Sequence, residues 1–388
     1  MENLLPSPQG FVGTTANLGL KEGADDFAVV ASSAPTTSAA VFTRSRFAGA
    51  SVVINREADL SAFRGMVTIS KNANVATGEE GRANALEVRR LAAELVGCRP
   101  EELLVASTGV IGVQYPMDLL RSSLDKLAGT VGPLDADGLA AAGAAIMTTD
   151  THPKVETRTV GAATLTGVAK GVGMIEPNMA TMLAYFFTDA AVPAADLDAI
   201  FRRVVDRTFN AVSIDTDTST SDTAAVFANG LAGEVDLAAF EEALHDCALA
   251  LVKQIASDGE GASKLISVTV AGARDDAQAK RVAKTIVNSP LVKTAVHGAD
   301  PNWGRIAMAI GKCEDDLDIE PENVAIAFGG TRIYPGSVSP ETLAGLSTYL
   351  QGSEVSIEVT LGIAEGAFTV YGCDLTEGYI RINADYTT

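Results

Sequence analysis

The stretch Lys170-Gly-Val-Gly-Met-Ile-Glu-Pro-Asn-Met-Ala-Thr-Met-Leu-Ala-Tyr-Phe-Phe-Thr-Asp189 is the most informative part of this chain. A basic residue and two glycines come before an apolar run, Met182–Phe187, whose length is that of a core strand. At the entrance of this run the small residue Ala180 is followed by the hydroxyl residue Thr181. Considered alone, Thr181 is an ordinary β-branched strand residue.

The chemistry of Thr181 offers a second interpretation. A threonine hydroxyl is a poor nucleophile unless a base lies beside it. If the bond between Ala180 and Thr181 is broken, Thr181 gains an α-amine with an ordinary pKa of about 7.7–8.0, whereas a lysine side chain has about 10.4. One residue then carries both the nucleophile and its base. The hydroxyl oxygen could itself break the bond by attacking the preceding carbonyl, after which water would hydrolyse the ester.

A second segment fits this interpretation. The run Ala106-Ser-Thr-Gly-Val-Ile-Gly112 ends an apolar strand with a polar, glycine-containing turn. Such a turn can direct a backbone N–H and the hydroxyl of Thr108 at one point, next to Gly109. That is the arrangement of an oxyanion hole, in which one donor is typically worth about 10²–10³ in rate. In isolation, the same turn is also a plain strand ending.

Hydrophobic periodicity indicates helices and strands without a regular βαβ rhythm. One helical pattern begins near Ala83, and three others cover Ala194–Val212, Leu237–Ser257 and Asp275–Val287. Strand-like runs cover Ser51–Ile54, Val67–Ser70, Leu103–Ser107, Leu265–Ala271, Val324–Phe328, Val355–Leu361 and Phe368–Tyr371. Surface loops are expected at Gly129–Gly138 and Gly329–Pro340. We therefore expect an α+β fold, with layered α/β packing and mixed sheets.

Composition limits the classes of function. The chain has 388 residues, of which 47% are hydrophobic, so it has enough apolar surface for a large core. With 29 Lys and Arg against 49 Asp and Glu, its net charge of −20 would repel phosphate backbones, and we expect no nucleic-acid partner. No apolar run approaches the roughly 18 residues that span a bilayer, and the first lysine is Lys21. We therefore expect no membrane segment, no secretory signal and a cytoplasmic location.

No metal or cofactor motif is present. The four cysteines form no CxxC pair and the three histidines have no HxxxH spacing. Glu176 stands where a dinucleotide loop starting at Gly171 would need its third glycine. The run Asp215–Asp222 resembles the start of a calcium loop but lacks its sixth-position glycine and its closing glutamate. We expect a hydrogen-bonded structural loop there, and neither a metal nor a cofactor.

Taken together, these residues resemble the ornithine acetyltransferase family, which is also called the glutamate N-acetyltransferase or ArgJ family. The resemblance runs over nearly the whole length, in eight blocks whose order and spacing make chance agreement very improbable. The blocks are Asn72–Gly78, Ser107–Gly112, Met147–Thr151, Lys170–Leu183, Phe209–Asp222, Ser257–Gly261, His297–Arg305 and Ile382–Thr388.

The resemblance implies a self-processed N-terminal-threonine acyltransferase. Its precursor cuts itself between Ala180 and Thr181, giving an α chain of residues 1–180 and a β chain of residues 181–388 that stay together and pair into a heterotetramer. Thr181 then carries the acetyl group, and Thr108 and Gly109 match the oxyanion-hole positions. The substrate-binding positions are matched by Thr181 itself, Lys170, Glu260, Asn383, Thr388 and one of Thr148 and Thr149.

These residue types suit the substrates that the resemblance implies. N2-acetylornithine has an α-carboxylate that Lys170 can pair, and a side-chain ammonium that Glu260 can hold. Asn383 and Thr388 add neutral hydrogen bonds, so we expect the chain end to fold back and line the pocket. Thr181 takes the acetyl group, ornithine leaves, and glutamate collects the acetyl group in a ping-pong reaction. Because the acetyl group arrives as an amide, no cofactor is needed.

Two residues depart from the commonest form of the cleavage block. Val172 and Glu176 stand where Ser and Ala are more usual, and in this the chain resembles members linked to specialised-metabolite clusters. The residues leave open whether acetyl-CoA is a second donor. They also leave two rival interpretations: a self-cleaving N-terminal-threonine amidase or aminopeptidase that releases acyl groups to water, and a non-catalytic binding protein in which Thr181 is only a core residue.

Overall fold

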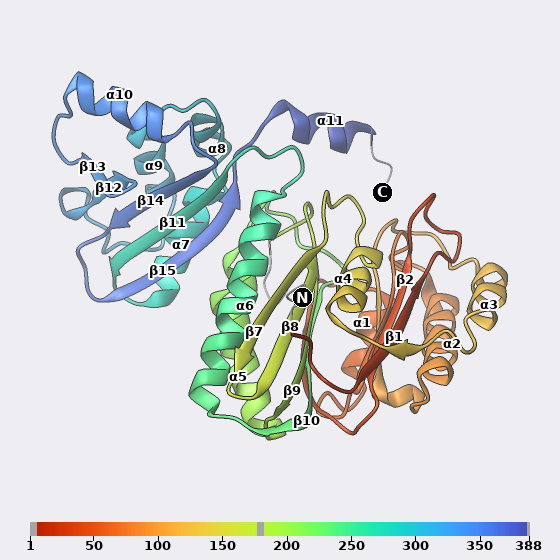
Figure 1. Ribbon diagram of the computed structural model, residues 1–388. Coiled ribbons are helices and arrows are strands. Elements are labelled where there is room, and N and C mark those ends of the chain that lie inside the picture. The colour runs from red at the N-terminus through yellow and green to blue at the C-terminus, as the bar shows by residue number, and fades with distance from the viewer. Residues whose placement is uncertain (1–5, 177–181, 386–388) are drawn as a thin grey trace, which may run out of the picture.

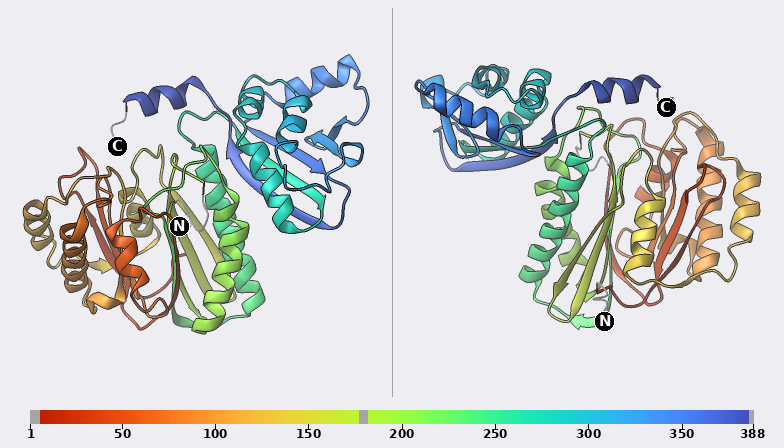
Figure 2. Two further views of the ribbon diagram at one scale, coloured as in Figure 1. Left: turned by 180° about the vertical axis from the view of Figure 1, so that it is seen from behind. Right: turned by 45° about the horizontal axis from the view of Figure 1, so that its top comes forward.

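The computed structural model describes residues 6–176 and 182–385, which form three five-stranded sheets and the helices that cover them. The predicted cleavage site at Ala180–Thr181 and the predicted substrate residue Thr388 lie outside these described residues. Figures 1 and 2 show two of the sheets stacked in one body, with the third sheet in a separate unit beside it.

The first two sheets pack face to face. The first, in the order β5-β4-β2-β1-β6, contains β1 (Phe11–Ala16), β2 (Phe27–Ser32), β4 (Gly65–Ile69), β5 (Leu103–Ser107) and β6 (Gly132–Pro133). The second, in the order β3-β10-β9-β8-β7, contains β3 (Thr37–Phe42), β7 (Lys154–Val160), β8 (Ala163–Lys170), β9 (Leu183–Ala191) and β10 (Thr223–Glu234). One core lies between them, where the rings of Phe11 and Phe187 meet edge to face with centroids 5.3 Å apart.

Helices cover the outer faces of this pair of sheets, which gives four layers (Figure 1). The first sheet is covered by α1 (Ala50–Arg56), α2 (Gly78–Val96) and α3 (Met117–Asp125). The second is covered by α5 (Ala194–Arg207) and α6 (Leu237–Ser257), while α4 (Ala136–Ala145) contacts strands of both sheets. Local signals set some of these bounds: Gly97 ends α2 with a φ of 71°, and Asp236 caps α6 by accepting the N–H of Ala239.

The central strand β9 explains why the apolar run is continuous. Its odd-numbered residues Tyr185 and Phe187 face the core between the sheets, whereas Ala184 and Phe186 face the core under α5 and α6. Phe187 stacks on Phe227 with ring centroids 5.6 Å apart, and both rings are fully buried. Because both faces of the strand are covered, the first half of β9 is almost entirely apolar, and its buried polar residues Thr188 and Asp189 form hydrogen bonds with Thr164.

The third sheet has its own core and helices. In the order β13-β12-β14-β11-β15 it contains β11 (Leu265–Ala273), β12 (Ala325–Phe328), β13 (Thr331–Tyr334), β14 (Glu354–Thr360) and β15 (Gly366–Cys373). Its helices are α7 (Asp276–Val287), α8 (Pro290–His297), α9 (Trp303–Ile310) and α10 (Pro340–Tyr349). The last helix, α11 (Glu377–Asp385), leaves this unit and runs back over one end of the two-sheet body (Figures 1 and 2).

The expected α+β fold with layered, mixed sheets is confirmed. Each of the three sheets contains one parallel pair of strands, and its other neighbouring strands are antiparallel. The strand Leu103–Ser107 and the helix Leu237–Ser257 have the predicted bounds. None of the helices in the described part of the chain has both the length and the apolar character needed to cross a bilayer.

Three local predictions are wrong. Ser51–Ile54 is not a strand but part of α1, in which Asn55 bonds both backbone groups of Val105, with its amide donating to the carbonyl at 2.7 Å. This tertiary contact and the burial of Val52 and Ile54 outweigh the β propensity of the run. The expected loop Gly129–Gly138 contains β6 and the start of α4, and the expected loop Gly329–Pro340 contains β13.

Candidate active site

The candidate site lies at the end of the second sheet where β8 ends and β9 begins. Lys170, the last residue of β8, pairs with Leu183, the first residue of β9. On the other side of β9, Thr223 pairs with Leu183 and its N–H donates to the carbonyl of Met182 at 2.9 Å. The first residues of the chain after Thr181, Met182 and Leu183, therefore lie between Lys170 on β8 and Thr223 on β10.

Five of the predicted substrate-binding residues come together at this end. The Nζ of Lys170 lies 3.2 Å from Oγ1 of Thr148, and the hydroxyl of Thr149 donates to Oε1 of Glu260 at 3.2 Å. From α11, the amide of Asn383 donates to Oε2 of Glu260 at 2.8 Å. Both threonines of the Thr148–Thr149 pair thus contact another predicted residue, one on the cationic side and one on the anionic side.

A buried ionic network supports these residues. The side chain of Lys154 is fully buried, and its Nζ lies 2.8 Å from Oδ1 of Asp150 and 2.7 Å from Oδ2 of Asp258. Asp150 also accepts the backbone N–H of Gly171 at 2.7 Å, and Asp258 accepts the backbone N–H of Thr151 at 3.1 Å. The network therefore fixes both chain segments that flank Lys170 and the threonine pair. The sequence reasoning missed it, although Asp150 and Asp258 lie inside two of the quoted blocks.

The charges around Lys170 are balanced. Burial lowers the pKa of Lys170, while the carboxylates of Asp150, Asp222 and Glu260 act in the opposite direction. Burial would raise the pKa of Asp150, but the ammonium groups of Lys170 and Lys154 more than offset this and the pKa is lowered. Lys170 and Glu260 thus bring opposite charges to this end of the sheet, whereas Asp150 is held by Lys154 and Gly171.

Gly173, in the turn that follows Lys170, leaves room for Glu260. A Cβ atom on Gly173 would lie 2.5 Å from Oε2 of Glu260 and 2.6 Å from its Cδ, so a larger residue would displace the carboxylate. The N–H of Glu260 donates to the carbonyl of Val172 at 2.8 Å. The turn therefore places Glu260.

The predicted oxyanion turn follows β5. Gly109 has a φ of 131°, and a Cβ there would lie 2.2 Å from the carbonyl carbon of Lys71. The N–H of Thr108 donates to the carbonyl of Ile69 at 3.0 Å. Within residues 6–176 and 182–385, the hydroxyl of Thr108 makes no hydrogen bond, and the backbone of the turn pairs with that of Asn72.

Lys71 links this turn to the substrate-binding residues. Its carbonyl accepts the N–H of Val110 at 3.2 Å, and its Nζ donates to the carbonyl of Thr148 at 2.8 Å. The sequence reasoning missed Lys71, which precedes the first quoted block by one residue. Its φ of 74°, which is unusual for a side chain of this size, is not readable from the sequence.

The run Asp215–Asp222 forms a hydrogen-bonded loop beside the segment that leads to the predicted cut. The carboxylate of Asp215 accepts the backbone N–H of Met174 at 2.7 Å and that of Ile175 at 2.8 Å. The hydroxyl of Thr218 donates to the carbonyl of Glu176 at 3.1 Å. The carboxylate of Asp215 is therefore committed to the backbone of the cleavage block.

Glu176, one of the two unusual residues of the cleavage block, contacts the third-sheet unit. Its Oε1 lies 3.0 Å from Nζ of Lys284 on α7, and its Oε2 accepts the amide of Asn288 at 2.9 Å. The Glu176 and Lys284 side chains are 21% and 17% exposed, so this ion pair is largely shielded from solvent. The other unusual residue, Val172, is buried.

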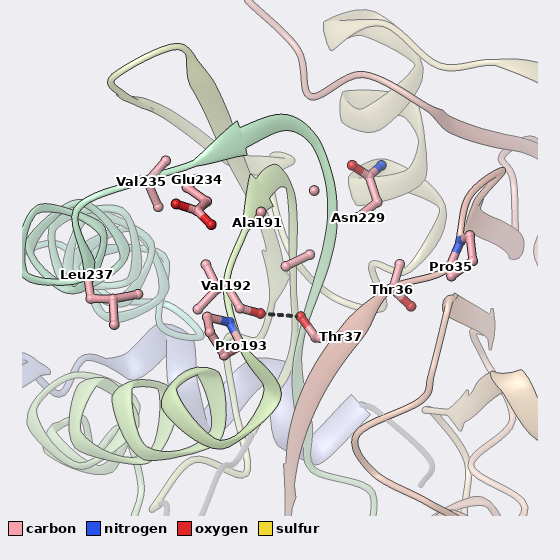
Figure 3. A pocket seen from close by; sticks show the side chains of 12 residues that line it. Pro35, Thr36, Thr37, Ala191, Val192, Pro193, Asn229, Glu234, Val235 and Leu237 are labelled. Atoms are coloured by element: carbon pink, nitrogen blue, oxygen red, sulfur yellow. Dashed lines mark hydrogen bonds between the residues drawn. The ribbon is translucent and has the colours of Figure 1, made fainter.

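A separate cavity of about 620 Å³ lies at the opposite end of β9. Its lining includes Thr37, Val192 and Glu234, and Figure 3 shows the Thr37 hydroxyl bonded to the carbonyl of Val192. None of the predicted site residues that the structure describes lines this cavity. It is distinct from the candidate site, which is formed by the start of β9.

The comparisons with known proteins agree with the resemblance. The ArgJ family model matches residues 13–388. Glutamate N-acetyltransferase Oat2 of Streptomyces clavuligerus is 62% identical over 389 residues, which cover 98% of each chain. The arginine biosynthesis bifunctional protein ArgJ of Rhodococcoides fascians is 56% identical over 386 residues, which cover 98% of this chain and 95% of that one. The crystal structure of arginine biosynthesis bifunctional protein ArgJ from Bacillus halodurans is 42% identical, covers 53% of this chain and 100% of its own, and has a TM-score of 0.49. This chain therefore belongs to the ArgJ family and is an acyltransferase of that family.

Proposed function

We propose that this enzyme transfers an acetyl group from N2-acetylornithine to glutamate through an acetyl-Thr181 intermediate, after cutting itself between Ala180 and Thr181. Residues 1–180 would form the α chain and residues 181–388 the β chain. The observation that carries the proposal is the meeting of Lys170, the Thr148–Thr149 pair, Glu260 and Asn383 beside the start of β9. These residues come from distant parts of the sequence, and together they bring an ammonium, a carboxylate and hydroxyl groups to the start of β9.

The two charges suit the donor. The ammonium of Lys170 would pair the α-carboxylate of N2-acetylornithine, with the hydroxyl of Thr148 beside it. Glu260, held by Thr149 and Asn383, would receive the side-chain ammonium. Thr388 would add a further hydrogen bond from the chain end.

The chemistry would consist of two acyl transfers. The Oγ1 of Thr181 attacks the acetyl carbonyl while its own α-amine takes the hydroxyl proton. The hydroxyl of Thr108 and the N–H of Gly109 stabilise the oxyanion, the C–N bond of the amide breaks, and ornithine leaves with that proton. The amine of glutamate then attacks the acetyl ester of Thr181, giving N-acetylglutamate and the free hydroxyl. The site must exclude water, which would otherwise hydrolyse the ester.

The names of the relatives support the wider setting of this proposal. Both the Rhodococcoides fascians relative and the Bacillus halodurans structure carry names that refer to arginine biosynthesis. We propose the same pathway for this enzyme, a cytoplasmic location, and an assembly in which two α and two β chains form a heterotetramer. No cofactor takes part in the proposed steps.

Acetyl partitioning tests the proposal. Purified enzyme is incubated with N2-acetylornithine labelled in its acetyl group, at increasing glutamate concentrations, and labelled N-acetylglutamate and free acetate are measured. Transfer predicts that N-acetylglutamate rises with glutamate while acetate falls. Release of acetate at a rate that does not depend on glutamate would show an amidase instead.

A further inference from the structure

Two ammonium groups converge on Thr148, and only one of them has a place in the proposed reaction. The Nζ of Lys170 contacts the Thr148 hydroxyl at 3.2 Å, and the Nζ of Lys71 contacts the Thr148 carbonyl at 2.8 Å. Since the backbone of Lys71 packs against Gly109, its side chain extends from the predicted oxyanion turn towards Lys170. Lys71 therefore lies between the groups proposed to activate the acetyl carbonyl and the groups proposed to bind the rest of the substrate.

The surroundings of the two lysines differ. Three carboxylates act on Lys170, whereas the Lys71 ammonium, among the described residues, donates a hydrogen bond to the neutral carbonyl of Thr148. Burial lowers the pKa of Lys71, and the neighbouring cations Lys21 and Lys170 lower it further, with Asp150 acting the other way. Around Lys71 the cations Lys21 and Lys170 thus outnumber the one carboxylate, Asp150, although the whole chain has a net charge of −20. An anion placed there would relieve that repulsion.

The substrates supply such an anion in one half of the reaction. N2-acetylornithine and glutamate share an α-carboxylate, which one cation can hold. They differ at the end of the side chain, which is an ammonium in ornithine and a carboxylate in glutamate. Glu260 suits the ammonium and would repel the carboxylate, so a pocket that serves both substrates needs a further cation for glutamate.

We propose that Lys71 binds the side-chain carboxylate of glutamate and thereby selects glutamate as the acetyl acceptor. This inference rests on the proposed function, because it requires glutamate to enter the same site. A lysine is suited to the task because its long, flexible side chain can leave the Thr148 carbonyl and take up a carboxylate. The exchange replaces a hydrogen bond to a neutral carbonyl with an ion pair, which adds the attraction between two opposite charges.

Separate kinetics for the two substrates test the inference. In a ping-pong reaction, kcat/KM for N2-acetylornithine reports the first half-reaction and kcat/KM for glutamate reports the second. For Lys71→Met we expect kcat/KM for glutamate to fall at least tenfold and that for N2-acetylornithine to change less than threefold. Lys71→Arg should keep most of the glutamate activity, because it keeps the charge.

The acceptor series separates selection from positioning. Glutamine has the shape of glutamate without its side-chain carboxylate, so the ratio of kcat/KM for glutamate to that for glutamine should fall at least tenfold in Lys71→Met. Exposed Lys126 provides the matched control, since Lys126→Met removes the same charge away from the site and should leave this ratio unchanged. An unchanged ratio in Lys71→Met, or equal losses for both substrates, would overturn the inference. Failure of the wild-type enzyme to acetylate glutamate would instead contradict the proposed function.

Discussion

The carboxylate of Asp215 accepts the backbone N–H of Ile175 at 2.8 Å, which ties the segment leading to the proposed cut to the Asp215–Asp222 loop. The residue that follows this loop, Thr223, holds the other side, since its N–H donates to the carbonyl of Met182 at 2.9 Å. One short stretch of chain therefore holds the described residues on both sides of Ala180–Thr181. A nucleophile that attacks its own preceding carbonyl depends on such positioning.

Asp215→Asn should slow self-cleavage. The amide offers one acceptor oxygen where the carboxylate offers two, so one of the N–H groups of Met174 and Ile175 loses its partner. Such a loss costs about 1–3 kcal/mol, and we expect processing to be at least fivefold slower when followed on denaturing gels after a pulse of synthesis. Asp217→Asn, an exposed carboxylate in the same loop, is the matched control. Processing of Asp215→Asn at the wild-type rate would show that this contact does not position the cut.

Reversing the Glu176–Lys284 ion pair should recover part of the stability that each single change loses. Glu176→Lys and Lys284→Glu each place two like charges at a largely shielded contact, so both variants should unfold at lower temperature than the wild type. The double variant should recover part of the loss, with a coupling of about 0.5–3 kcal/mol between the two positions. Thermal unfolding of the four proteins measures this coupling. If the stability losses of the two single variants simply add in the double variant, the Glu176–Lys284 contact does not stabilise the packing of the third-sheet unit against the two-sheet body.

Lys154→Met should be strongly destabilising. It removes the cation between Asp150 and Asp258 and leaves two buried carboxylates without their shared partner. Breaking a buried pair in this way costs about 3–5 kcal/mol. Urea unfolding at neutral pH should detect it, with Lys253→Met at an exposed site as the control. A change below about 1 kcal/mol would contradict the role given to this network.

Stability should fall in acid partly through Asp150. Burial would raise the pKa of Asp150, but Lys170 and Lys154 lower it below its ordinary value, so the folded chain favours the ionised form. The stabilisation is fully present above the ordinary pKa of about 3.9 and is lost as the pH falls through the folded value. The difference in unfolding free energy between wild type and Asp150→Asn should therefore be largest near neutral pH and shrink below about pH 4. A difference that stays constant across this range would contradict the shift.

The fold was predictable from the sequence wherever the hydrophobic pattern of a single segment is enough to identify a helix or a strand. The apolar run at Met182–Phe187 predicted a buried strand, and β9 contains most of it because both of its faces are covered. Ser51–Ile54 failed because its β-branched residues serve equally well on a buried helix face, which only the contact of Asn55 with β5 decides. Local patterns do not encode such long-range pairings.

The candidate site was predictable to the extent that its residues lie in the quoted blocks. The structure brings Lys170, Thr148, Thr149, Glu260 and Asn383 together, and their substrate-binding roles stay a prediction. Lys71 and Lys154 were missed because a lysine in a polar stretch looks like a solvated surface charge until the fold buries it. Each has a partner that is distant in sequence: Lys71 and Thr148 are separated by 77 residues, and Lys154 and Asp258 by 104.

The chain ends of the purified, denatured enzyme test the central claim most directly. Intact-mass measurement combined with determination of each N-terminal residue should find two chains, residues 1–180 and residues 181–388, the second beginning with Thr181. The Thr181→Ala variant should give one uncut chain without transferase activity. A wild-type enzyme that remains a single chain of 388 residues and transfers acetyl groups at full rate would contradict the account.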